Sequence, residues 1–334
     1  MTAAIPLVHY GLGPIGIEVA RLAAGRDYLT SVAAVDVDPR LVGRPLAELT
    51  GAPGQARVTV GPALPPPVPG VPPVVLHCTG SGLAQVLPQL LDCVAAGGHV
   101  VSTCEELSHP WRTHPELAAR LAAAATEQQV TVLGTGVNPG YAMDFWPVAL
   151  TATCHRVDHV AVHRVQDAGA RRLPLQRKVG AGMSRAEFGA AAAAGTVRHV
   201  GLPESAWAVG AALGWSLREV TETLEPVIAQ QALDSALGPI PAGHVAGVRQ
   251  VARGVDGSGE RVLLTLEMAV GLDHPRDEVQ IRGLPDLRAE IPGGIPGDLA
   301  TAAMVVNSVP LVVAARPGLI TVADLPPPRP ARVG

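Results

Sequence analysis

Aromatic residues make up only 3% of this 334-residue chain, although 48% of its residues are hydrophobic. A chain with this much apolar material can bury a full core, but valine, leucine, alanine and isoleucine must build it. The length predicts two domains, or one domain with a large insertion.

Cysteines, basic runs and long apolar runs are also scarce, and each absence argues against a class of protein. The four cysteines show no CxxC spacing, so the sequence indicates neither a disulfide framework nor a zinc knuckle. A net charge of −4 without a basic run argues against a nucleic-acid partner. No stretch reaches the ~18 uninterrupted apolar residues that would indicate a membrane partner. The first apolar run begins near residue 1, so we expect no signal peptide and a reduced, cytoplasmic protein.

One stretch near the N-terminus organises the chain. An apolar run at residues 5–8 leads into a G-x-G-x-x-G motif and then into a helical pattern, an order typical of dinucleotide-binding folds. The first glycine permits a tight turn, the second lets backbone amides approach a pyrophosphate, and the third lets the helix lie close to the strand. The helix N-terminus also attracts phosphate. We therefore expect the cofactor to contact Gly11, Gly13, Pro14, Ile15 and Gly16.

A carboxylate follows at the distance that this fold requires. Asp36 ends a second apolar run, 20 residues beyond Gly16, where it would accept hydrogen bonds from the adenosine ribose and repel a 2′-phosphate. This predicts NAD as the cofactor. Asp38 adds a second negative charge, whereas the nearby Arg40 leaves NADP as the alternative. The competing interpretation is a glycine turn in another kind of α/β domain.

Further apolar runs predict a doubly wound parallel sheet with small and polar residues at its carboxyl edge. The run at residues 74–78 leads into a loop in which we expect Cys78, Thr79 and Gly80 to touch the cofactor. The proline-rich run before it, at residues 62–73, is predicted to be an irregular connection, because proline lacks an amide donor and restricts its predecessor.

Two adjacent carboxylates, Glu105 and Glu106, follow the next predicted strand at residues 99–103. A carboxylate beside a nicotinamide ring is a natural general base. The alternative is that both residues begin the turn into the helix at residues 113–128 and are solvated there.

The loop at residues 134–141 follows another short strand and contains the turn signal Asn-Pro-Gly. We expect Asn138 to contribute to the cofactor site. Tyr141, Phe145 and Trp146 fall within six residues of one another. They form either ordinary packing or the apolar wall of a substrate pocket.

The second half of the chain predicts an α+β domain with a largely open sheet. Its strand patterns lie at residues 156–165, 245–251, 261–270 and 278–281, and its helical patterns at 184–194 and 203–213. The long apolar helix at residues 297–315 needs two covered faces, so we expect it to return to the first domain. The predicted domains are a dinucleotide-binding domain at 1–150, with this helix, and a substrate domain at 151–296. An open face rich in valine, leucine and alanine is costly in water, which predicts a homodimer through the second domain.

Three histidines, His155, His159 and His163, would share one face of a strand and suggest a metal site. Positions four apart on a strand lie roughly 13 Å from one another, too far to share one ion. The objection would not hold if residues 155–163 formed a helix instead of a strand. We predict no metal site.

Four motifs together resemble the 2,4-diaminopentanoate dehydrogenases and related native amine dehydrogenases. They are GLGPIG, STCEEL at residues 102–107 followed by Pro110 and Trp111, GTGVNPG at 134–140, and GDLATAA at 297–303 with Asn307 and Pro310. The resemblance covers nearly the whole chain and implies a fold related to dihydrodipicolinate reductase. It also implies that a glutamate of the EEL motif is the catalytic acid/base, first Glu106 and then its neighbour Glu105. The basic HHxxxK-type run of dihydrodipicolinate reductases is absent, which argues against that activity.

The resemblance implies reversible oxidative deamination of a small amine, or reductive amination of a ketone or aldehyde with ammonia. Two alternatives remain. One is a dehydrogenase of an alcohol, similar to homoserine and sugar dehydrogenases, but no lysine lies between residues 74 and 150, where such an enzyme would place one. The other is an NAD-binding sensor without chemistry.

Overall fold

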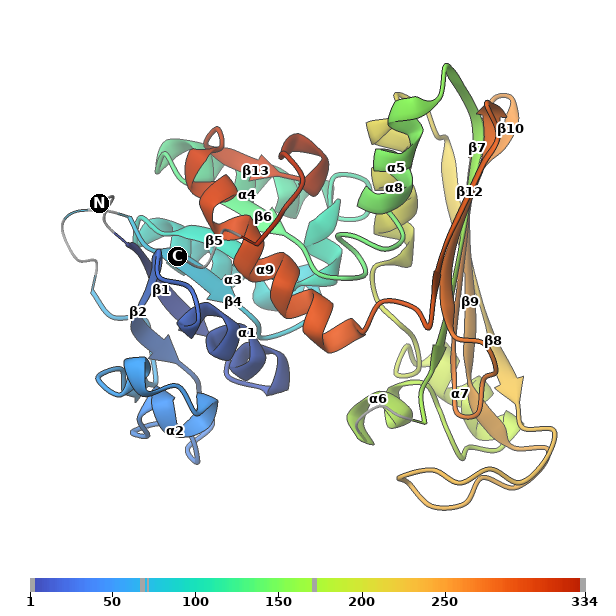
Figure 1. The fold of residues 1–334 in the computed structure, drawn as a ribbon, viewed down its shortest axis with the longest axis horizontal. Helices are drawn as coiled ribbons and strands as arrows, with labels where there is room; N and C mark the ends of the chain where they lie inside the picture. The colour runs from blue at the N-terminus through green and yellow to red at the C-terminus, as the bar shows by residue number, and fades with distance from the viewer. Residues whose placement is uncertain (1–3, 67–69, 71, 170–172, 331–334) are drawn as a thin grey trace. The chain divides into compact units, whose positions relative to one another are not determined.

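The computed structural model describes residues 4–66, 70, 72–169 and 173–330 (Figure 1). The chain divides into two compact units, the first formed by Met1–Tyr141 and Pro296–Gly334 and the second by Ala142–Ile295. Residues 142–150, which the sequence predicts as part of the first domain, group with the second unit. The reason is that helix α5 (Phe145–Leu150) packs against helix α8 (Leu202–Ala212).

A seven-stranded parallel sheet forms the first unit, as the sequence predicts. Its order is β13-β6-β5-β4-β1-β2-β3. The central strands are short and almost wholly buried, which suits their continuous runs of valine and leucine. The strands are β1 (Ile5–Tyr10), β2 (Leu29–Val35), β3 (Val60–Gly61), β4 (Val74–His77), β5 (His99–Ser102), β6 (Thr131–Gly134) and β13 (Gly318–Ile320). Apart from residues 67–69 and 71, which lie outside the described residues, the proline-rich connection before β4 has no helix or strand.

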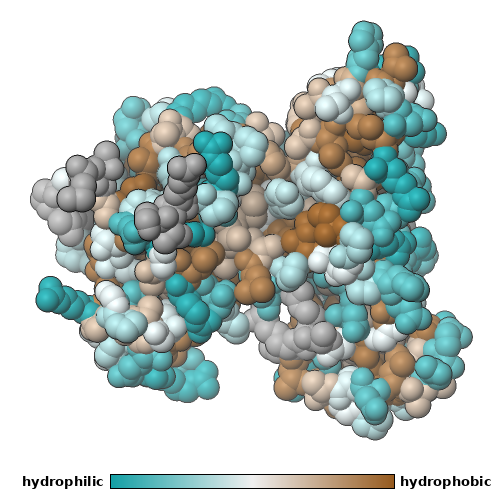
Figure 2. Space-filling model, in the orientation of Figure 1, coloured by the Kyte–Doolittle hydropathy of each residue, from teal (hydrophilic) through white to brown (hydrophobic). Residues whose placement is uncertain are grey.

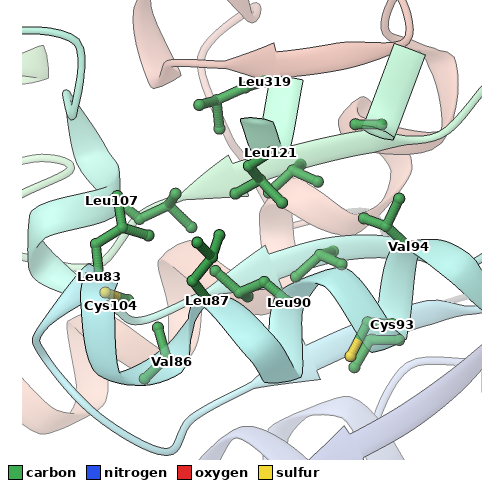
Figure 3. Close-up of a cluster of buried hydrophobic side chains, with 14 of the residues drawn as sticks. Leu83, Val86, Leu87, Leu90, Cys93, Val94, Cys104, Leu107, Leu121 and Leu319 are labelled. Atoms are coloured by element: carbon green, nitrogen blue, oxygen red, sulfur yellow. The ribbon is translucent and has the colours of Figure 1, made fainter. Parts of the chain in front are cut away.

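Helices pack against this sheet and complete its core. They are α1 (Pro14–Ala24), α2 (Leu46–Thr50), α3 (Leu83–Ala95), α4 (Pro115–Glu127) and α9 (Gly297–Ala314), with short 3-10 helices η1 (Pro53–Gln55), η2 (Glu105–Ser108) and η4 (Val322–Asp324). Figure 3 shows side chains of α3 gathered with Leu107, Leu121 and Leu319 in one buried cluster. Among the described residues, α9 alone is long and apolar enough to cross a membrane by length and composition. It packs against α1 and strands β4, β5 and β6, which marks it as a core helix.

A six-stranded mixed sheet of order β12-β11-β7-β10-β9-β8 dominates the second unit. Only β7 and β10 pair in parallel. The strands are β7 (Arg156–Asp167), β8 (Glu219–Ile228), β9 (Val245–Asp256), β10 (Gly259–Ala269), β11 (Arg276–Leu284) and β12 (Leu287–Pro292). The remaining elements are η3 (Thr151–Thr153), α6 (Leu173–Lys178) and α7 (Arg185–Ala193). Helix α8 covers one face by packing against β8, β9 and β10, so the predicted α+β arrangement is confirmed.

The opposite face of this sheet differs in chemistry from the predicted apolar surface. Ala161, Leu263 and Thr265 lie at its centre, beside a hollow of about 200 Å³. Charged pairs surround them, because Glu267 Oε1 lies 3.3 Å from His163 Nε2 and 3.1 Å from Arg249 Nε. We call these six residues the open-face cluster. The face is therefore a small apolar centre within a ring of paired charges.

Candidate active site and cofactor site

The glycine loop between β1 and α1 has two glycines that the protein itself requires. Gly11 has φ +88°, and a side-chain carbon there would lie 2.6 Å from the Cys78 carbonyl oxygen. A side-chain carbon at Gly16 would overlap the Gly11 carbonyl oxygen. Gly13 is different, because an added carbon meets no atom of the described residues within 4 Å. Packing therefore does not explain Gly13, whereas close approach of a pyrophosphate does.

The N-terminus of α1 has the features of a phosphate site. Gly13 is the N-cap, Pro14 occupies the first turn, and no side chain caps the helix. The first amides of a helix have no intrahelical partner and carry the positive end of its dipole. An uncapped N-terminus on a glycine loop thus fits the phosphates of a dinucleotide.

Asp36 lies directly after β2 and joins two loops. Its Oδ2 accepts a hydrogen bond of 2.6 Å from the Leu12 amide, and its Oδ1 accepts one of 2.8 Å from the Asp38 amide. Arg40 donates to both oxygens of Asp38. Hydrogen bonds from the guanidinium lower the pKa of Asp38 to about 2. Arg40, the cation that the sequence analysis names for a 2′-phosphate, is thus already paired with a carboxylate.

A buried histidine, which sequence reasoning missed, fixes the loop after β4. His77 Nδ1 lies 2.9 Å from Ser102 Oγ, and its Nε2 lies 2.9 Å from Gln89 Oε1 and 3.0 Å from Thr79 Oγ1. Burial lowers the pKa of His77 to about 4, so the ring is neutral near pH 7. The Cys78 amide donates to the Tyr10 carbonyl. This network holds the predicted cofactor residues Cys78 and Thr79 beside the glycine loop, and Gly80 follows directly.

Glu106 is anchored at the carboxyl edge of the sheet by one of its two oxygens. It lies in η2, directly after β5. Oε2 accepts a 2.7 Å hydrogen bond from the Leu83 amide and lies 2.9 Å from His114 Nε2. Since α3 has no side-chain cap of its own, Glu106 provides the acceptor for its first amide. Within the described residues, Oε1 has no hydrogen-bond partner, so this oxygen is available for chemistry.

The sequence also gives no direct sign of the partnership between Glu106 and His114. His114 is the N-cap residue of α4, and its amide donates to the Pro110 carbonyl over 2.7 Å. This turn directs the ring to Glu106. Glu105, the second candidate, is half-buried in the same 3-10 helix, and its carbonyl accepts a hydrogen bond from Ser108.

The loop after β6 contains a buried side-chain amide, that of Asn138. The Thr135 amide donates to the Ser102 carbonyl, and the Val137 amide donates to Thr301 Oγ1 of α9, so the loop is held from two sides. Asn138 is 7% exposed, and neither side-chain polar atom has a partner among the described residues. An unsatisfied buried polar group costs about 1–3 kcal/mol. A ligand with both a donor and an acceptor, such as a nicotinamide carboxamide, would satisfy it.

The three aromatic residues predicted to line a substrate pocket do not belong to one unit. Tyr141 ends the first unit, whereas Phe145 and Trp146 begin α5 in the second. The helix starts there because the Asp144 carboxylate accepts a hydrogen bond from the Phe145 amide and another from Ser205. A shared pocket wall remains a prediction.

The histidines considered for a metal site lie in or next to β7. His159 and His163 pair with Glu260 and Glu267 of the neighbouring β10 instead of with one another. Within the part of the chain that the structure describes, no group of three His, Cys, Asp or Glu side chains is arranged to hold a metal ion.

This fold and site define a class of protein. A doubly wound sheet, an uncapped helix on a glycine loop and a carboxylate after β2 belong to a nicotinamide-dependent oxidoreductase, here joined to an α+β domain. The family model for the C-terminal domain of 2,4-diaminopentanoate dehydrogenase matches residues 141–333. The chain is also 34% identical over 271 residues to the 2,4-diaminopentanoate dehydrogenase of Acetoanaerobium sticklandii, covering 77% of this chain and 74% of that protein. The chain belongs to the 2,4-diaminopentanoate dehydrogenase family.

Solved structures agree with this assignment. An amine dehydrogenase from Mycobacterium smegmatis superposes with a TM-score of 0.85 at 27% identity, covering 99% of this chain and 98% of that chain. GenD2 from gentamicin A biosynthesis, solved in complex with NAD, shares the fold alone, with a TM-score of 0.52 at 20% identity over 87% of this chain and 73% of that chain. The predicted family, fold class and enzyme class are thereby confirmed: the chain is an NAD(P)-dependent amine dehydrogenase acting on CH–NH2 donors.

Proposed function

We propose that this enzyme catalyses the reversible oxidative deamination of a small amine with NAD, and that Glu106 is its acid/base. An ammonium substrate, NAD⁺ and water give a ketone or aldehyde, NADH, an ammonium ion and one proton. The observation that carries the proposal is the Glu106 carboxylate, held through Oε2 by the Leu83 amide and His114 while Oε1 is available.

The chemistry assigned to Glu106 follows from this geometry. Oε1 takes a proton from the substrate ammonium, which gives the nitrogen the lone pair it needs to form a C=N bond. The bound nicotinamide supplies the hydride acceptor. After releasing that proton, Glu106 takes one from the water that attacks the iminium carbon and returns it to the nitrogen. The C–N bond then breaks, and the hydroxyl proton of the carbinolamine leaves with ammonia as the ammonium ion. The protein's remaining contribution is orientation of the reacting groups.

Asp36 supports NAD as the preferred cofactor. Its carboxylate is fixed by the Leu12 and Asp38 amides at the end of β2, where a ribose 2′-hydroxyl would find an acceptor and a 2′-phosphate would meet a negative charge. The pairing of Arg40 with Asp38 leaves that negative charge without compensation from Arg40.

The acid/base assignment is tested by two matched variants, Glu106→Gln and Glu105→Gln. The first should keep the amide contact of α3 and the NADH affinity but lower the amination rate by about 10²-fold or more. The second should do less, because adjacent side chains of a 3-10 helix such as η2 point in different directions. Loss of activity in Glu105→Gln alone would assign the acid/base role to Glu105. Near-wild-type rates in both variants would exclude this mechanism.

The substrate is tested with 2,4-diaminopentanoate, the compound in the relative's name, and with a panel of ketones and aldehydes in ammonia with NADH, followed at 340 nm. Turnover of an amine supports the proposal. Turnover of alcohols alone would favour the alcohol dehydrogenase alternative, and cofactor binding without any turnover would favour the sensor.

The open-face cluster supports a homodimer. Its ring of opposite charges around Ala161, Leu263 and Thr265 suits a self-complementary contact between two copies related by a two-fold axis. We assign the dimer contact to this face.

A further inference from the structure

We infer that His114 is a relay residue that carries the net proton of each turnover between Glu106 and the solvent. This inference rests on the proposed function, because it takes Glu106 as the acid/base. It assigns a role to the histidine that contacts the anchored oxygen of that carboxylate.

The stoichiometry of the reaction requires such a path. Oxidative deamination of an ammonium substrate releases one proton beyond those kept in the ammonium product and NADH. Glu106 accepts protons from the substrate nitrogen and from water, and it returns one fewer than it accepts. A single carboxylate holds one proton at a time, so Glu106 must pass the ammonium proton onward before it takes the proton of water, and must receive one in the reverse direction.

The geometry gives His114 direct access to this proton. Its Nε2 lies 2.9 Å from Glu106 Oε2, within hydrogen-bond distance. The side chain of His114 is 28% exposed, and that of Glu106 is 23% exposed. A proton that reaches Oε2 can therefore pass to Nε2, and the ring can release a proton from Nδ1. The opposite end of the carboxylate, Oε1, stays available for the substrate.

The other donor on Oε2 cannot replace the histidine. The Leu83 amide holds the oxygen in place but neither gives up nor accepts a proton. The titratable group that contacts His114 is Glu106. Within two residues along the chain, Cys104 and Glu105 precede Glu106, and Arg112 and Glu116 flank His114. Burial raises the pKa of the Cys104 thiol to about 12, so it stays protonated at neutral pH. An imidazole ring has two nitrogens, so it can accept a proton at Nε2 and release one from Nδ1.

Two substitutions separate a relay from mere positioning. His114→Gln keeps an N–H donor that can hold Oε2 but cannot carry a proton, and His114→Ala removes both functions. Rates are measured with 2,4-diaminopentanoate and NAD⁺, or with the fastest carbonyl of the panel, ammonia and NADH. Both variants should lose about 10-fold or more in kcat, with NADH affinity near that of the wild type. Added imidazole should restore the rate of the His114→Ala variant. The gain should be proportional to the imidazole concentration and to the fraction of imidazole in its basic form.

The matched control is His155→Ala, which removes an exposed histidine of the second unit and should show neither loss nor rescue. NADH titration and thermal unfolding show whether each variant is folded. The response to imidazole is interpreted only for variants that are folded and bind NADH. A His114→Gln rate and pH profile within twofold of the wild type would overturn the inference and leave His114 as a positioning residue. Full activity of Glu106→Gln together with imidazole rescue at His114 would instead contradict the proposed base, so the two failures are distinguishable.

Discussion

Asp36 combines a structural contact with a proposed cofactor contact, and its substitutions should separate the two. We expect the wild type to bind NADH more tightly than NADPH, by about 10-fold or more, because a fixed carboxylate repels a 2′-phosphate. Asp36→Ala should narrow this gap but also loosen the glycine loop, since the Leu12 and Asp38 amides lose their acceptor. Asp36→Asn keeps one acceptor and serves as the control. Fluorescence titration measures both affinities, and equal or reversed values in the unmutated protein would contradict the assignment.

Buried histidines should make the first unit sensitive to acid. Burial lowers the pKa of His9 and of His77 to about 4, whereas an unfolded histidine titrates near 6.5. Between these values the unfolded chain binds more protons than the folded one, so stability rises with pH. Their contribution is therefore complete above pH ~6.5 and is lost as the pH falls toward 4, with a slope of at most about 1.4 kcal/mol per pH unit for each ring.

The measurement is thermal unfolding between pH 7.5 and 5. We expect Tm to fall over this range, and His9→Gln to flatten the fall, because glutamine does not titrate. His155→Gln, at an exposed position, should leave the slope unchanged. A His9→Gln variant with the full wild-type slope would show that this ring does not contribute to it.

Single residues show where sequence reasoning succeeds and where it ends. The positions of Asp36 and Glu106 after strands can be predicted, because each follows an apolar run, and their roles stay predictions. Their partners cannot, because Leu12, Leu83 and His114 reach them only after helices and turns have formed. His77 is also missed, since a histidine that ends an apolar strand resembles a surface residue until Ser102 and Gln89 are seen around it.

At the scale of elements, the N-terminus of α1 offers a matched pair of substitutions. Gly16→Ala should destabilise the protein by a few kcal/mol, because the new carbon overlaps the Gly11 carbonyl and the helix must move. Gly13→Ala has no such clash within the described residues and an ordinary backbone, with φ −63°. It should keep the wild-type Tm yet weaken NADH binding by about 10-fold or more, because the methyl group occupies the approach to the helix amides.

Thermal unfolding and NADH titration on both variants test this pair. Unchanged NADH affinity in a folded Gly13→Ala protein would contradict the binding of the pyrophosphate at Gly13. A stable Gly16→Ala protein would instead show that the loop can shift without cost.

Two strands that the sequence fails to predict have a common physical cause. Strands β8 and β12 form the two edges of the second sheet and alternate exposed with half-buried residues. Edge strands carry charges that limit pairing with other chains, so their hydrophobic signal is weak. The buried strands β7, β9, β10 and β11 have that signal and are predicted. The boundary at residue 142 is missed because it depends on contacts between α5 and α8.

At the scale of the whole molecule, the proposed dimer can be tested through the open-face cluster. Leu263 lies at its apolar centre, and Leu263→Arg would place an unpaired charge there in each copy. We expect a wild-type dimer at micromolar concentration and a monomeric variant by sedimentation. Leu284→Arg, at a residue 53% exposed at the end of β11, is the control and should remain dimeric. A monomeric wild type, or a dimeric Leu263→Arg variant, would exclude this face.

Because α9 and β13 lie in the first unit although they follow the whole second unit in sequence, the order of synthesis differs from the order of completion. On the ribosome, residues 142–295 emerge as one contiguous segment and can fold as soon as they leave the exit tunnel. Residues 1–141 emerge earlier, yet β6 pairs with β5 alone, without β13, and the sheet lacks the helix that packs against β4, β5 and β6 until residues 297–320 are translated. A nascent chain thus exposes an apolar sheet face for most of its synthesis, and this face is where a chaperone would bind.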